Sequence, residues 1–148
     1  MCLNVFLAAD RPLPIVAWNP DEPGFSVQSA SARDTAAIRH AVRGRHLFYA
    51  GSHDGCGCGF LHHWASAEGH LSDEPHPGPK RESAARSTAS LVDYLRRVAA
   101  GGPVELYSCW QGDEAAPPLA EIALAPDSLD VSSFVVREGE HVTIGPAV

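Results

Sequence analysis

The fold is decided by residues 83–110, SAARSTASLVDYLRRVAAGGPVELYSCW, where a helical pattern passes directly into a strand pattern. Ser83 is suited to cap the helix, and Gly101, Gly102 and Pro103 end it. The apolar stripe that predicts the helix consists of Leu91, Tyr94, Leu95 and Val98. Residues 104–110 alternate between two faces, as a strand does. One predicted face carries Val104, Leu106, Ser108 and Trp110, and the other carries Glu105, Tyr107 and Cys109.

Similar patterns occur on both sides of this stretch. Asp34 is suited to cap a shorter helix, whose apolar positions are Ile38, Ala41 and Val42. Short apolar or alternating runs predict strands at residues 2–8, 15–18, 25–28 and 47–50. Residues 119–125 fit either a strand or a short helix. Near the C-terminus, residues 134–137 and 141–144 predict a hairpin. These elements predict an α+β protein with a single mixed or mainly antiparallel sheet packed against two helices. Because each helix leads at once into an apolar strand, we expect the strands at 47–50 and 104–110 to be neighbours.

The 148 residues suit a single domain that spans residues 1–148. Residues 65–82 are polar and rich in proline, with Pro75, Pro77 and Pro79 at alternate positions. Such a composition disfavours regular structure, so we predict a long, mobile Pro/Gly-rich loop between the two helices.

Charge excludes several classes of partner. The chain has 11 basic and 18 acidic residues and a net charge of −7, whereas nucleic acids are bound by clustered lysine and arginine. No apolar run approaches the ~20 residues that cross a bilayer, and the first residues lack the pattern of a secretory signal. We therefore expect a cytoplasmic protein that binds neither nucleic acid nor membrane. In that reducing compartment, its four cysteines are expected as metal ligands, redox groups or buried side chains.

The chemistry is concentrated in residues 51–60, GSHDGCGCGF. Its glycines free the backbone, so that the Cys56 and Cys58 thiols can converge on one ion, and His53 lies shortly before them. Thiolate and imidazole ligands suit zinc, copper(I) or iron and do not suit magnesium or calcium. The adjacent histidines His62 and His63 are further candidates.

Strand direction extends this ligand set. If the first strand runs antiparallel to the strands at 47–50 and 104–109, its start lies beside their ends. Cys2 and Cys109 then join Cys56 and Cys58 at one edge of the sheet. The sequence thus predicts a site for one transition metal, zinc first and copper(I) second, with candidate ligands Cys56, Cys58, Cys109, Cys2 and His53.

Three other interpretations stay open. A Cys-Gly-Cys pair can form a disulfide and exchange thiols with a partner, and successive glycine amides can bind an anion. The glycine-rich loop can also serve a metal-free interaction domain, with Trp64 and Trp110 as anchors. The pattern identifies no reaction.

The first few residues, Met-Cys before an apolar run, resemble the start of N-terminal-nucleophile hydrolases. This resemblance implies removal of Met1, with the Cys2 thiol as nucleophile and its own α-amine as base. Asn4 or His53 would be its partners, and the family's fold would be a larger one of four layers.

Overall fold

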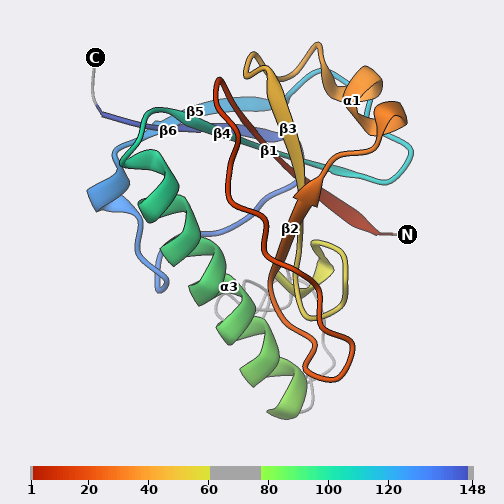
Figure 1. Ribbon diagram of the computed structural model, residues 1–148, viewed down its shortest axis with the longest axis vertical. Helices are drawn as coiled ribbons and strands as arrows, with labels where there is room; N and C mark the ends of the chain where they lie inside the picture. Colours follow the sequence, from red (N-terminus) through yellow and green to blue (C-terminus); the bar gives the residue numbers. More distant parts are fainter. Residues whose placement is uncertain (1, 61–77, 147–148) are drawn as a thin grey trace.

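A single sheet of six strands forms the centre of the computed structural model, which describes residues 2–60 and 78–146 (Figure 1). The strands are β1 (Leu3–Ala9), β2 (Ser26–Ser29), β3 (His46–Gly51), β4 (Val104–Trp110), β5 (Ala120–Leu124) and β6 (Glu140–Ile144). Their order across the sheet is β2-β3-β1-β4-β6-β5. Neighbouring strands run antiparallel except β5 and β6, which are parallel. The predicted α+β class with one mixed sheet is therefore confirmed.

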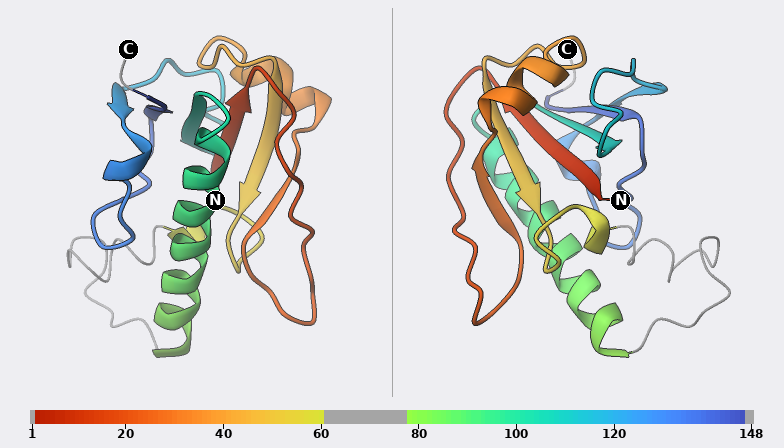
Figure 2. Two further views of the ribbon diagram at one scale, coloured as in Figure 1. Left: turned by 60° about the vertical axis from the view of Figure 1, so that its left-hand side comes forward. Right: turned by 90° about the vertical axis from the view of Figure 1, so that its right-hand side faces the viewer.

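Helices lie on both faces of this sheet. They are α1 (Ala32–Ile38), α3 (Gly78–Ala99) and a 3₁₀ turn, η1 (Pro126–Ser128). The long helix α3 crosses one face, and the short helix α1 lies on the other (Figures 1 and 2). In the two described ranges, no helix is long and apolar enough to span a bilayer.

Strand β1 is buried on both faces because it lies between β3 and β4 and under both helices. The side chains of one face pack with α3, and these are Leu3, Val5, Leu7 and Ala9. Phe6 and Ala8 of the opposite face pack with Ile38 of α1. Burial on both faces explains why β1 reads as a nearly continuous apolar run. Asn4 is the one polar residue in it.

Strand β4 divides its side chains as the sequence predicted. Val104 and Leu106 lie in the core beneath α3, whereas Tyr107 and Cys109 lie in the smaller core beneath α1. The strand is also antiparallel to β1, as the predicted gathering of cysteines requires.

The topology corrects two expectations. Strands β3 and β4 are not neighbours, because β1 is inserted between them and pairs with both. The predicted C-terminal hairpin does not form, since residues 134–137 are not a strand and β6 pairs with β4 and β5 instead. Residues 15–18 provide only an isolated bridge from Val16 to Val27.

Both helices begin earlier than the sequence suggested. The N-cap of α1 is Ser31, whose Oγ accepts a hydrogen bond from the Asp34 N–H (3.0 Å) and donates one to Asp34 Oδ2 (2.8 Å). Asp34 thus completes the cap from within the first turn. Helix α3 begins at Gly78 rather than at Ser83, so residues 78–82 of the predicted loop are helical. The remainder of that loop, 65–77, lies outside the described residues.

Candidate metal centre

The glycine-rich segment after β3 folds back onto the start of β1. The Gly57 N–H donates to the Leu3 carbonyl (2.9 Å), which attaches the segment to the central strand. Ser52 is fully buried and organises the turn. Its Oγ donates to the Cys56 carbonyl (2.6 Å) and accepts from the Gly59 N–H (3.0 Å). In Figure 2, this yellow segment lies beside the N-terminal end of β1.

Two glycines are required by this path. Gly55 has a φ of +81°, a conformation that L side chains rarely adopt. At Gly57, a Cβ would lie 2.6 Å from Val5 Cγ2 and 3.0 Å from the Leu3 carbonyl oxygen. Only a residue without a side chain lets the backbone approach β1 so closely, and this approach brings the neighbouring cysteines to the start of the chain.

The result is a cluster of three sulfur atoms, from Cys2, Cys56 and Cys58. Their Sγ atoms all lie within 4.8 Å of one another, and each residue is half-buried. The Leu3 N–H also donates to Cys58 Sγ (3.2 Å). The structure thus brings together three of the five predicted ligands, from segments far apart in the sequence.

The surroundings of Cys56 favour its neutral thiol over the thiolate. The pKa of the Cys56 thiol is raised to about 12, mainly by burial, because the backbone hydrogen bond at Cys58 that lowers it is outweighed. A metal ion at the three sulfurs would instead favour the thiolate form, because a coordinated thiol loses its proton.

Cys109 does not join the cluster. It is buried in the core beneath α1, near Phe6, Ile38 and Tyr107, and pairs in register with Asn4. Its pKa is raised to about 12, mainly by burial and in smaller part by the negative charge of Glu114. Two further residues along β4 separate it from the level of Cys2, which is about 7 Å.

His53 also lies outside the cluster, and it attaches the loop to α3. Its N–H donates to Ser87 Oγ (3.0 Å), and its Nδ1 lies 3.2 Å from the same oxygen. Its Nε2 lies 3.5 Å from Asp54 Oδ1. Both ring nitrogens therefore face local partners, and the imidazole has a positioning role for the loop that holds Cys56 and Cys58.

Ser52, Ser87 and Tyr49 are the contributors that sequence reasoning missed. The Tyr49 hydroxyl donates to Asn4 Oδ1 (3.2 Å) beside the cluster. No local pattern connects Ser87 with a loop 34 residues earlier. Asn4 did carry a signal, as the one polar side chain in a buried strand.

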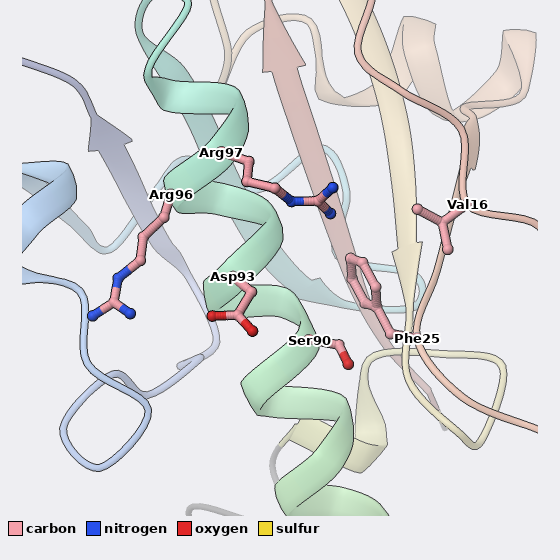
Figure 3. A pocket seen from close by; sticks show the side chains of 6 residues that line it. All are labelled: Val16, Phe25, Ser90, Asp93, Arg96 and Arg97. Carbon is pink, nitrogen blue, oxygen red and sulfur yellow. The ribbon is translucent and has the colours of Figure 1, made fainter.

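A separate groove of about 620 Å³ lies between α3 and the segment that leads into β2 (Figure 3). Its wall contains Phe25, Arg96 and Arg97 but no cysteine. In Figure 3, Arg96 points away from Phe25, and its guanidinium donates to the Leu129 carbonyl. Arg97 lies over the Tyr94 ring at 5.9 Å from its centroid. These cations are engaged by the fold, and we do not assign chemistry to the groove.

The other candidate residues are placed as follows. His62, His63 and Trp64 lie outside the described residues. Trp110 is half-buried and packs against the core beneath α3, so it is not an exposed anchor.

Comparison of the chain with protein-family models, with curated proteins and with solved structures finds no match. The site geometry therefore carries the functional argument.

Proposed function

We propose that the protein binds one transition metal ion through the thiolates of Cys2, Cys56 and Cys58, with zinc as the preferred ion and copper(I) as the alternative. The observation that carries this proposal is the convergence of three Sγ atoms within 4.8 Å of one another. Soft thiolate ligands select such ions over magnesium and calcium.

The spacing of the sulfurs suits one ion. Thiolates bound to zinc at about 2.3 Å in tetrahedral geometry lie roughly 3.8 Å apart, so the cluster needs little closure. The N–H···S hydrogen bond from Leu3 (3.2 Å) holds Cys58 Sγ against the start of β1 and so orients this ligand. The half-buried sulfurs remain open to an incoming ion.

The described residues 2–60 and 78–146 supply three protein ligands, which leave one position of a tetrahedral zinc ion for a further ligand. Zinc sites with three protein ligands are typical of catalysis, whereas structural sites commonly have four. This count supports a site with an exchangeable ligand.

The alternatives that use the same thiols are less well supported. Thiol exchange needs a readily formed thiolate, but burial raises the pKa of Cys56 to about 12. In the resemblance to N-terminal-nucleophile hydrolases, Asn4 would assist Cys2, but its side chain is bonded to Tyr49 and Glu114.

The decisive experiment is elemental analysis of protein purified without added metal, together with Cys56→Ala and Cys109→Ala. We expect about one equivalent of zinc or copper in the wild type and in Cys109→Ala, and a loss of most of it in Cys56→Ala. Circular dichroism verifies that both variants fold.

Equal metal content in the two variants, or less than about half an equivalent in the wild type after reconstitution with zinc or copper(I), would overturn the proposal. Competition between the protein and chelators specific for zinc or copper(I) then identifies the preferred ion. Intact mass shows whether Met1 is removed, and its retention excludes the N-terminal nucleophile.

A further inference from the structure

A polar cavity of about 690 Å³ opens on the α1 side of the sheet. Its volume falls in the range of roughly 300–1,000 Å³ that is usual for small-molecule sites. The residues that matter for its chemistry are Asn4, Arg33, Asp34, Tyr49, Gln111 and Glu114. Asn4 and Tyr49 come from interior strands, where apolar side chains would be expected.

A hydrogen-bond chain holds these groups in place. The Tyr49 hydroxyl donates to Asn4 Oδ1 (3.2 Å), and Asn4 Nδ2 donates to Glu114 Oε1 (3.1 Å). The Gly112 N–H also donates to Glu114 Oε2 (3.0 Å). The chain connects β3, β1 and the loop after β4, so the carboxylate of Glu114 is fixed against the sheet rather than left in solvent.

The cavity adjoins the sulfur cluster. Asn4 lies in β1, and Cys2 directly precedes this strand. The Gln111 N–H donates to the Cys2 carbonyl (2.8 Å). Burial raises the pKa of Tyr49 above its ordinary range, and Cys56, Cys2 and Cys58 contribute to this rise. The phenol therefore lies within electrostatic reach of all three thiols.

The charges around the cavity are of both signs. Asp34 and Glu114 provide two carboxylates, and Arg33, which also lines the cavity, provides a guanidinium. Within the described part of the chain, Arg33 has no ion pair or hydrogen bond. The guanidinium is thus available for a carboxylate from outside, and the two acidic groups suit an ammonium.

We propose that this cavity binds a small zwitterion that carries an ammonium and a carboxylate group, held between Glu114 and Arg33 beside the sulfur cluster. The placement of the ligand next to an open metal position rests on the proposed function. Recognition by the cavity does not, because none of its charged groups is a proposed metal ligand.

Calorimetric titration tests this with two zwitterions of different length, L-serine and seryl-serine. Ethanolamine lacks the carboxylate of serine and glycerate lacks its ammonium, so both serve as matched compounds. We expect binding of at least one zwitterion, and binding weakened about tenfold or more by Glu114→Gln and by Arg33→Gln, because each removes a charge-assisted contact. Glu121→Gln, on exposed β5, is the matched control and leaves binding unchanged.

The titrations are made with metal-loaded and with metal-free full-length protein. Binding of neither zwitterion, equal binding of ethanolamine or glycerate, or no effect of Glu114→Gln and Arg33→Gln overturns the inference. If the protein binds the zwitterion but takes up neither zinc nor copper(I) on reconstitution, the cavity proposal stands and only the metal proposal fails. If the protein binds metal but neither zwitterion, the metal proposal stands and the cavity proposal fails.

Discussion

The two faces of the sheet differ in composition, although β1 and β4 contribute to both. Beneath α3, the central side chains are apolar and closely packed, as Leu7, Leu95 and Leu106 illustrate. Beneath α1, a helix of only seven residues leaves part of the face uncovered. That face contains Asn4, Glu105 and His141 alongside Phe6 and Tyr107, which are buried or half-buried.

The polar groups on the α1 side are held by specific partners. Glu105 accepts hydrogen bonds from the Arg43 N–H (3.0 Å) and the Gly44 N–H (2.7 Å), and His141 Nε2 lies 2.9 Å from its Oε1. The comparison indicates that the sheet face beneath α3 stabilises the fold by apolar burial. The face beneath α1 contributes to stability and also carries polar groups of the kind that bind ligands. Perturbations of the two faces should therefore have separable effects.

The largest effect is expected from pH on metal affinity. Because the pKa of Cys56 is raised to about 12, this thiol is protonated at neutral pH and must release its proton to bind metal. Affinity should rise with pH, by about tenfold per pH unit for each thiol proton that the metal displaces. Competition with a chelator of known pH dependence, between pH 6 and 8, measures the slope.

The Cys109 thiol sharpens this test, because its pKa is also raised to about 12 but it lies outside the cluster. Cys109→Ala should leave the slope unchanged. A flat profile, or a slope that changes with Cys109, contradicts the assignment of ligands.

The next effect is the loss of packing beneath α3. Leu95 is fully buried, and Leu95→Ala should lower the free energy of unfolding by about 2–5 kcal/mol. Metal content per folded chain should not change, because Leu95 is not itself a proposed ligand, although Cys58 packs against the same core. Urea denaturation and elemental analysis measure the two quantities.

The control is Leu119→Ala, at a side chain 77% exposed, which should change the free energy of unfolding by less than about 0.5 kcal/mol. A similar loss of stability in both variants would refute the assignment of stability to the face beneath α3.

A smaller effect is expected from the buried carboxylate on the α1 side. Glu105→Gln preserves shape but turns an NH₂ group toward backbone donors, and should cost about 1–3 kcal/mol. Glu121→Gln alters a side chain 72% exposed and should cost far less. Urea denaturation compares the two, and equal losses would mean that Glu105 contributes no more than a surface charge.

Most of the fold was predictable from local patterns. The two faces of β4 followed from its alternation, and α3 followed from the stripe that contains Leu91 and Leu95. The order of strands was not predictable, because nothing local shows that β1 is inserted between β3 and β4. The prediction of a C-terminal hairpin was wrong for the same reason, because β6 pairs with β4 and β5 rather than with residues 134–137.

The site was predictable in part. The antiparallel direction of β1 correctly brought Cys2 to Cys56 and Cys58. Cys109 was misplaced because position along a strand matters as much as direction, and its register with Asn4 leaves it beneath α1. Without the register, neither that separation nor the contact between Tyr49 and Asn4 can be obtained from spacing.

In the proposed metal site, the origin of the sulfurs in two distant segments would let the ion tie these segments together. An ion shared by Cys2 and Cys56 is a reversible cross-link that closes a loop from residue 2 to residue 56. For a covalent cross-link across such a loop, chain-entropy theory assigns about 4 kcal/mol. Removal of such an ion would free Cys2 from the glycine-rich loop, whereas β1 would stay paired with β3 and β4.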